Sequence, residues 1–373
     1  MKVLNFGSLN LDYVYAMDEF VQPGETRACL GRQIHCGGKG LNQSIAMARA
    51  GLPVWHAGII GQEGGILKDA LAESGVRLDF LRRQDAPGGH TVIQVDSRGQ
   101  NCILLYPGTN AAITKEYVDE VLSSFDFGDV LLLQNEINLG PSIMEKAAER
   151  GLFIAFNASP IPGVENSPLE FVYWLFVNEI EGAALSGETA PRAIPRALRA
   201  KFPKTEIILT LGSDGSFWDN GRETVFCPAC HVQAVDTTAA GDTFTGFFLR
   251  GVLGEDCGLA PLTLATCASG IAVTQIVRCQ EPRISSVVAD YEACGRNAVD
   301  YLDSKGCRRI ALIAGYSHQS PFKGRYEGYS KAIAAHGLEE ILAESTQPVN
   351  SFEYGYECAN QLLRDEPELD AIL

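Results

Sequence analysis

The sequence predicts an α/β protein with a largely parallel sheet, and three observations support this prediction. Short apolar runs such as DVLLLQ, FIAFNA and FVYWLFVN have the length of buried strands. They alternate with stretches of helical spacing such as LNQSIAMARAG and MEKAAERG. Several of these stretches end in a glycine, including Gly51, Gly75 and Gly151, as helices commonly do. Right-handed crossovers between parallel strands follow from this order.

The first half of the chain supplies the elements in sequence. A strand is predicted at residues 3–6, a helix at LNQSIAMARAG, a strand at VWHAGIIG and a helix at DALAESGV. Between them, YVYAMDEF, RQIHCGG and HTVIQVDSRGQNCILLY alternate on two sides, which is typical of a small antiparallel sheet. We expect this small sheet to lie over one edge of the main sheet as a lid. The main sheet then continues through DVLLLQ, FIAFNA, FVYWLFVN and EIILTLG.

The pattern starts afresh beyond about residue 282. VVAD reads as a strand, YEACGRNAVDYLDSKG as a helix, CRRIALIAG as a strand and GRYEGYSKAIAAHGL as a helix. The final DAIL reads as part of a further strand. We therefore expect two domains, at residues 1–282 and 283–373, of which the second is incomplete.

Charge and composition exclude several classes of partner. The 373 residues carry 30 Lys and Arg against 46 Asp and Glu, a formal charge of −16 that repels nucleic acid and anionic lipid. We find no apolar run of the roughly 20 residues that a membrane span needs. The start, MKVLNFGSLN, lacks the pattern of an export signal, and the odd count of 11 cysteines favours reduced thiols. We expect a cytoplasmic protein with no nucleic-acid or membrane partner.

The most informative stretch is VDTTAAGDTFTGFFLRGV, at residues 235–252. A strand enters, small residues turn the chain, and an apolar helix begins near Asp242. Backbone amides at such a helix start are unpaired and attract anions, so Ala240 and Gly241 can approach a phosphate. Asp242 beside that phosphate can take the proton of an attacking hydroxyl. The alternative is that Asp242 only caps the helix.

These residues also carry a resemblance. DTTAAGDTF resembles the C-terminal signature of the ribokinase-like (PfkB) family of sugar and nucleoside kinases, and HCGGKGLNQSIAMARAG resembles its first signature. GSLNLDYV, PGTNAAIT, LLLQNEI, VNEIEG and LTLGSDGS follow in the order and spacing of that family, over residues 1–280. The resemblance implies a mostly parallel central sheet flanked by helices, with a small lid sheet through which a homodimer can form.

The resemblance also assigns roles to residues. It implies that Asp242 is the catalytic base, with Ala240 and Gly241 in the anion hole. It places the sugar against Asn10, Asp12, Gly38, Lys39, Asn42, Glu136 and Asp242, and the nucleotide against Asn178, Thr210, Gly212, Ser213, Gly215, Gly241 and Thr266. Asn178 and Glu181 match an N-x-x-E element that orders Mg²⁺ through water, and Asp236 and Thr238 match carbonyl ligands of an activating K⁺. Taken alone, isolated carboxylates at strand ends are more often surface residues.

Two other motifs suggest different functions, a P-loop and a haem-attachment or redox site. GGKG at residues 37–40 is not a P-loop, because Gln33 and Gly40 stand where that motif needs Gly and Ser or Thr. CPACH, from Cys227 to His231, fits a haem-attachment or redox pattern. Haem attachment requires export, and the two cysteines replace apolar residues of a strand in the family. We therefore expect buried thiols there, with a redox or metal role as the alternative.

The second unit, residues 284–373, resembles an internal part of the sugar-sensing domain of LacI/GalR-type regulators. VVADYEACGRNAVDYLDSKGCRRIALIAG and GRYEGYSKAIAAHGL carry the likeness. Arg325 matches a position that often contacts effector in that family, although an arginine at a helix start is more often an ordinary surface residue. After GIAVT, residues 270–274, the segment QIVRCQEP lacks a glycine that helps hold K⁺ in the kinase family.

The expected function is ATP-dependent phosphorylation of the primary hydroxyl of a sugar, with Mg²⁺ bound to the nucleotide. GGKGLNQ and PGTNAAIT favour ribose, phosphorylated at its 5-hydroxyl. Fructose, deoxyribose and nucleosides stay open as substrates. The alternatives from other classes are a sugar-binding regulator that lacks catalysis and a gene fusion whose tail is unfolded.

Overall fold

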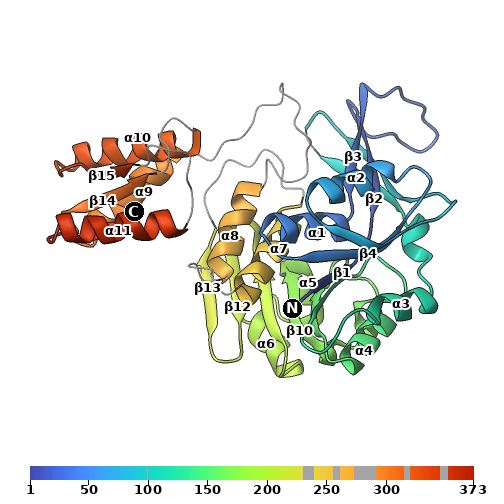
Figure 1. Cartoon of the computed structure of the whole chain (residues 1–373). Helices are drawn as coiled ribbons and strands as arrows, with labels where there is room; N and C mark the ends of the chain where they lie inside the picture. Colours follow the sequence, from blue (N-terminus) through green and yellow to red (C-terminus); the bar gives the residue numbers. More distant parts are fainter. Residues whose placement is uncertain (99, 230–238, 255–260, 273–290, 315–319, 345–351) are drawn as a thin grey trace. The chain divides into compact units, whose positions relative to one another are not determined.

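The computed structural model describes residues 1–98, 100–229, 239–254, 261–272, 291–314, 320–344 and 352–373 (Figure 1). The chain divides into two compact units, Met1–Ser285 and Ser286–Leu373. The predicted boundary between residues 282 and 283 and the predicted strand VVAD lie outside the described residues.

The described part of the first unit is built on a nine-stranded sheet in the order β13-β12-β11-β10-β9-β8-β1-β4-β5. Neighbours from β5 to β11 pair in parallel, while β12 and β13 add an antiparallel edge, so the prediction of a mostly parallel sheet is confirmed. Strand β1 pairs with β4 on one side and with β8 on the other. The order of the strands therefore changes direction at β1, which makes this position a topological switch point. The strands are β1 (Val3–Phe6), β4 (Val54–Ile60), β5 (Arg77–Arg83), β8 (Val130–Gln134), β9 (Phe153–Asn157), β10 (Val172–Asn178), β11 (Glu206–Thr210), β12 (Gly215–Asp219) and β13 (Thr224–Pro228).

Helices cover both faces of this sheet, because strands with two apolar faces need cover on each side. One face packs against α1 (Lys39–Arg49), α2 (Gly65–Glu73), α7 (Ala240–Leu253) and α8 (Pro261–Ala272). The other packs against α3 (Lys115–Leu122), α4 (Gly140–Glu149), α5 (Glu179–Ser186) and α6 (Ile194–Lys201). Short 3₁₀ turns lie at Gly108–Ala111, Val164–Asn166, Leu169–Phe171 and Gly212–Asp214.

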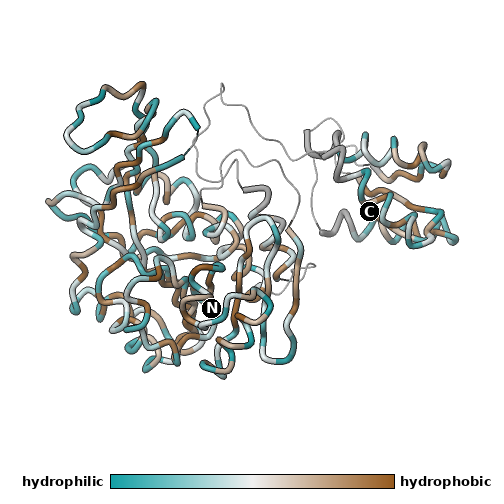
Figure 2. The backbone as a smooth tube through the Cα atoms, turned by 180° about the vertical axis from the view of Figure 1, so that it is seen from behind, coloured by the Kyte–Doolittle hydropathy of each residue, from teal (hydrophilic) through white to brown (hydrophobic). Residues whose placement is uncertain are grey.

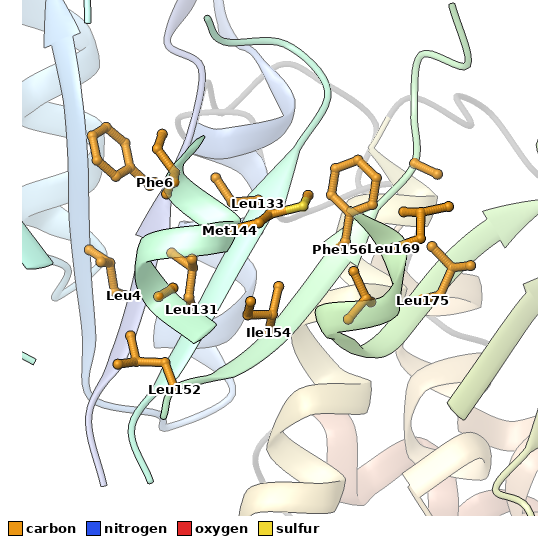
Figure 3. Close-up of a cluster of buried hydrophobic side chains, with 14 of the residues drawn as sticks. Leu4, Phe6, Leu131, Leu133, Met144, Leu152, Ile154, Phe156, Leu169 and Leu175 are labelled. Atoms are coloured by element: carbon orange, nitrogen blue, oxygen red, sulfur yellow. The ribbon is translucent and has the colours of Figure 1, made fainter. Parts of the chain in front are cut away.

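The apolar core between the strands and α4 is shown in Figure 3. Leu131 and Leu133 of β8 point to the same face as Leu4 and Phe6 of β1, and Met144 of α4 packs against them. All five side chains are buried. Burying each stabilises the fold by about 1.5–3 kcal/mol. The hydropathy colouring in Figure 2 shows the same apolar strands running through the interior of this unit.

The lid is a four-stranded sheet in the order β3-β2-β6-β7. Its strands are β2 (Asn10–Ala16), β3 (Gly31–Gly37), β6 (Gly89–Val95) and β7 (Asn101–Tyr106). The pairs β2–β3 and β6–β7 are antiparallel hairpins, as predicted, whereas β2 and β6 pair in parallel. The parallel pair arises because β2 and β6 belong to different hairpins, with β4 and β5 of the main sheet between them in the chain.

The second unit has a small parallel sheet in the order β15-β14-β16. It comprises α9 (Tyr291–Ser304), β14 (Ile310–Ala314), α10 (Ser320–Ala335), β15 (Ile341–Glu344), α11 (Phe352–Asp365) and β16 (Ala371–Ile372). Its core centres on Tyr329, whose buried hydroxyl lies 2.8 Å from the Ile310 carbonyl and 2.9 Å from the Ile341 carbonyl. The predicted helices and the strand CRRIALIAG are therefore present, with a core of their own.

Among the described residues, no helix combines the length and the apolar character that crossing a bilayer requires.

Candidate active site

A cavity of about 230 Å³ lies where the parallel strands of the main sheet end. The carboxyl ends of such strands meet at one edge of the sheet, which is where α/β proteins bind ligands. Six of the predicted site residues share this cavity, namely Lys39, Asn178, Glu181, Thr210, Gly241 and Asp242. The other lining residues are Asn157, Ser159, Phe176, Val177, Ala239 and Thr245.

Helix α7 opens onto the cavity with its amino end. The residue before it, Ala239, has φ 62°, in the left-handed region that a side chain rarely adopts, so the local backbone is held in an unfavourable conformation. Among the described residues, no side chain caps this helix. The amides of its first turn, at Ala240 and Gly241, are therefore available to an anion, and the helix dipole favours negative charge there.

Asp242 lies in the first turn of α7 and is 7% exposed. Its Oδ2 accepts a hydrogen bond of 3.0 Å from Asn42 Nδ2, and its Oδ1 accepts one of 2.9 Å from Gln43 Nε2. Asn42 and Gln43 belong to α1, some two hundred residues earlier in the chain. The structure thus brings the two predicted signatures of the sequence into direct contact.

The start of α1 depends on two glycines. Gly38 has φ +94°, and a Cβ on Gly40 would lie 2.3 Å from the Ser8 backbone nitrogen, so neither position accommodates a side chain. This close approach brings the Lys39 amide to 3.0 Å from Glu136 Oε2, which also accepts a hydrogen bond of 2.5 Å from Ser8 Oγ. Burial raises the pKa of Glu136, and the nearby Lys39 opposes the rise.

Asn10 and Asp12 lie on β2 of the lid. Asn10 Oδ1 accepts a hydrogen bond of 2.7 Å from Asn110 Nδ2, and Asp12 Oδ1 accepts one of 2.6 Å from Thr91 Oγ1. Burial raises the pKa of Asp12, while the Thr91 hydroxyl and His35 lower it. These two residues, with Gly38, Asn42 and Glu136, do not line the cavity described above.

Asn178 and Glu181 form the amino end of α5. Asn178 Oδ1 accepts from the Glu181 amide at 2.9 Å, and Glu181 Oε2 accepts from the Asn178 amide at 2.9 Å, which is a capping box. The N-x-x-E spacing predicts this cap as directly as it predicts a metal site. Both residues face the cavity, and Glu181 is 5% exposed.

The remaining predicted nucleotide residues lie at the turn after β11 and on α8. Gly212 and Gly215 form this turn with φ of +54° and +125°, and Ser213 lies between them. The Thr266 hydroxyl lies 2.8 Å from Ser216 Oγ and donates to the Leu262 carbonyl. Thr210 at the end of β11 lines the cavity, whereas Gly212, Ser213, Gly215 and Thr266 do not.

Several predictions fall on residues that are not described. Asp236 and Thr238, and Cys230 and His231 of CPACH, lie outside the described residues. Cys227 on β13 is partly exposed and its thiol faces the Pro228 carbonyl at 3.7 Å. No group of three or more His, Cys, Asp or Glu side chains that could hold a metal occurs in the described part of the chain. Arg325 is exposed on α10 of the second unit.

Some residues of the site were not predicted. Gln43 contacts Asp242, Gln134 contacts Gln43, and Asn110 contacts Asn10. A signal exists for Gln134 and for Asn157, because each is a polar residue at the end of an apolar strand, VLLLQ and FIAFN. Ser159 and Thr245 carry no comparable signal, since loops and helix faces are commonly polar.

A helix amino end beside a buried carboxylate, at the carboxyl edge of a parallel sheet, is typical of an α/β enzyme that binds a phosphate group. The family described as pfkB family carbohydrate kinase matches residues 1–279, and the chain belongs to this family. The resemblance found in the sequence is thereby confirmed. Residues 261–373 match the family described as periplasmic binding proteins and sugar binding domain of LacI family, which confirms the second resemblance.

Individual relatives are similar over the first unit. A ribokinase of Haemophilus influenzae is 32% identical over 279 residues, which cover 72% of this chain and 91% of that protein. The crystal structure of ribokinase from Cryptococcus neoformans in complex with ADP is 31% identical, with a TM-score of 0.63 over 73% of this chain and 93% of that one. The structure of Arabidopsis thaliana ribokinase complexed with ribose and ATP is 27% identical, with a TM-score of 0.64 over 73% and 92% of the two chains.

Proposed function

We propose that the first unit transfers the γ-phosphoryl group of ATP to the 5-hydroxyl of ribose, giving ribose 5-phosphate and ADP. The observation that carries this proposal is the buried Asp242 carboxylate in the first turn of α7, beside backbone amides that no side chain of the described residues caps. Membership of a carbohydrate kinase family supports phosphoryl transfer to a sugar. The ribokinases among its relatives support ribose as that sugar.

In the proposed reaction, Asp242 accepts the proton of the sugar hydroxyl. The freed oxygen bonds to the γ-phosphorus while the bond from that phosphorus to the bridging oxygen of ADP breaks. The amides of Ala240 and Gly241 donate to the oxygens of the phosphoryl group in transit, where the helix dipole adds to their effect. Lys39 lines the same cavity and contributes a positive charge.

We assign the sugar to the polar groups between the lid and α1. Several sugar hydroxyls can pair with the carboxylate and amide groups of Asn10 and Asp12 on β2, Asn42 on α1 and Glu136 after β8. The backbone at Gly38 and Lys39 is assigned to lie close to the sugar. The nucleotide is assigned to Asn178, Thr210, Gly212, Ser213, Gly215, Gly241 and Thr266.

Magnesium fits Glu181 and Asn178. The ion prefers oxygen ligands, keeps several waters, and in kinases binds substrate phosphates with one or two carboxylates. Only Oε2 of the buried Glu181 takes part in the capping box, and the side chain faces the cavity. When bound, Mg²⁺ neutralises charge on the nucleotide phosphates. An activating K⁺ is assigned to the carbonyls of Asp236 and Thr238, which lie outside the described residues.

Three further assignments complete the proposal. The kinase domain is residues 1–282, and residues 283–373 form a partial sugar-binding domain. The exposed apolar strand β7, with Leu104 at 70% exposure, supports a homodimer through the lid sheet. The odd number of cysteines supports a reducing, cytoplasmic location.

The test is ADP release by the purified chain with Mg²⁺ and ATP, across ribose, deoxyribose, fructose and ribonucleosides, with and without K⁺. We expect saturable turnover with ribose at the highest kcat/KM. Higher kcat/KM for another sugar would reassign the substrate, and stimulation by K⁺ would support the cation site. A folded chain that binds sugar but turns over none of them would support the regulator instead.

A further inference from the structure

A row of buried amide side chains lies behind Asp242 and is not accounted for by the assignments above. It runs from Gln43 on α1 through Gln134 at the end of β8 to Asn5 on β1. Gln43 and Asn5 are 0% exposed and Gln134 is 2% exposed. Burying amide groups without hydrogen bonds is unfavourable, so their arrangement is under strong energetic constraint.

The hydrogen bonds fix which way each amide points. Gln134 Nε2 donates to Gln43 Oε1 at 2.7 Å and to Asn5 Oδ1 at 2.9 Å. If the Gln134 amide were rotated by 180°, its Oε1 would face Gln43 Oε1 and Asn5 Oδ1, which are both acceptors. Asn5 Nδ2 is fixed in turn, because it donates to the Gly40 carbonyl at 2.7 Å and to Ser44 Oγ at 2.8 Å.

The consequence for Asp242 is direct. Since Gln43 Oε1 is held by Gln134, its Nε2 must face the Asp242 carboxylate, 2.9 Å from Oδ1. A hydrogen bond to a carboxylate in a buried site is stronger than one between neutral groups. The row also anchors Asp242 of α7 to two interior strands of the main sheet, β8 and β1, so that the carboxylate is held by rigid elements.

We propose that Gln43 is a positioning residue for Asp242 and that Gln134 sets the orientation of the Gln43 amide. The inference rests on the proposed function, in which Asp242 takes the proton of the sugar hydroxyl. Gln43 touches neither the sugar nor the nucleotide in this proposal. It acts by holding one carboxylate oxygen so that the carboxylate meets the hydroxyl in a single orientation.

Steady-state kinetics of Gln43→Met and Gln134→Met test the proposal, because methionine keeps the length of glutamine without its hydrogen bonds. We expect kcat of Gln43→Met to fall by about 10–100-fold while KM for ribose and for ATP changes by less than about threefold. Gln134→Met falls by less, and the double variant is no slower than Gln43→Met, because Gln134 acts through Gln43.

Thr205→Val is the matched control. Thr205 is 1% exposed and its hydroxyl donates to the Val172 carbonyl at 2.8 Å, so this variant also loses a buried side-chain hydrogen bond. Its kcat should stay within about twofold of the parent. Equal loss of kcat in Thr205→Val and Gln43→Met, or a rise in KM alone in Gln43→Met, overturns the proposal.

A second measurement separates this proposal from the proposed function. The melting temperatures of the parent, Gln43→Met, Asp242→Ala and the double variant form a cycle that needs no turnover. We expect non-additive shifts, because each substitution removes the same contact. A parent without turnover on any sugar, but with non-additive shifts, refutes the proposed function and keeps the contact. Additive shifts overturn the positioning role whatever the activity.

Discussion

Replacing Gly241 by alanine tests the anion hole most cleanly, because the structure separates its effect on stability from its effect on function. Gly241 is the second residue of α7 and lines the cavity. A Cβ built there meets no atom of the described residues outside its own helical turn within 4 Å, so this part of the structure accepts the methyl group. Alanine also favours a helix over glycine, by at most about 1 kcal/mol.

The expected loss of activity is much larger than any change in stability. In the proposed reaction, the phosphoryl group approaches the first amides of α7 through the open space beside Gly241. A methyl group in this space would keep the oxygens of the phosphoryl group beyond hydrogen-bond distance of those amides. Loss of one such donor costs about 2.7–4 kcal/mol in the transition state, a fall of about 10²–10³-fold in kcat. We therefore predict a well-folded variant with very low turnover.

The assay is ADP release with ribose, together with a thermal melt of the same preparation. Gly65→Ala is the matched control, because Gly65 opens α2, its added Cβ also meets nothing within 4 Å, and it does not line the cavity. The control should keep its turnover within about twofold. If Gly241→Ala turns over as fast as Gly65→Ala, the anion hole is assigned to the wrong amides.

Three further predictions concern the lid, the core and the second unit. Thr91→Val removes the hydrogen bond to Asp12, so the pKa of Asp12, already raised by burial, rises further. KM for ribose should increase about tenfold, and as the pH falls, sugar binding should be lost at a higher pH than in the parent. An unchanged pH profile of kcat/KM contradicts this prediction. Burial lowers the pKa of His56 from 6.5 to about 4, so below pH 6.5 the unfolded state binds a proton that the folded state does not. The free energy of unfolding therefore falls by about 3 kcal/mol between pH 6.5 and pH 4. Urea melts of His56→Phe should lack this part of the pH dependence. Tyr329→Phe removes a buried hydroxyl that bridges β14 and β15, so the second unit should lose about 2 kcal/mol in denaturant melts while ribose turnover stays unchanged; a matching loss of turnover contradicts two separate cores.

The sequence predicts the main sheet well because strands such as VLLLQ of β8 are buried on both faces and stand out as apolar runs. The pairing of β2 with β6 has no such signal, since neighbouring hairpins can pair in either direction until the main sheet places them. The start of α7 is predictable for a different reason: Ala240, Gly241 and Asp242 are adjacent in the chain, so a local motif carries them.

The support of Asp242 is not predictable in this way. Gln43 meets the carboxylate, and Gln134 meets Gln43, only through the packing of α1 and α7 against β8. Gln43 and Asp242 lie 199 positions apart in the sequence, with no local pattern that links them. The Asn178–Glu181 spacing predicts a metal-binding element, and the structure shows that the same spacing also caps α5. One pattern can serve both purposes, because the cap uses only one of the two carboxylate oxygens of Glu181.

Comparing the parent with Asp242→Asn in a single-turnover reaction with Mg²⁺, radiolabelled ATP and ribose tests the central claim most directly. Asparagine keeps the shape of aspartate but cannot accept the proton, so label transfer to ribose should slow by about 10²–10⁴-fold, while ADP still binds. The labelled product of the parent should be ribose 5-phosphate. Transfer by Asp242→Asn at the rate of the parent would contradict the assignment of Asp242 as the base, and with it the account of how this site works.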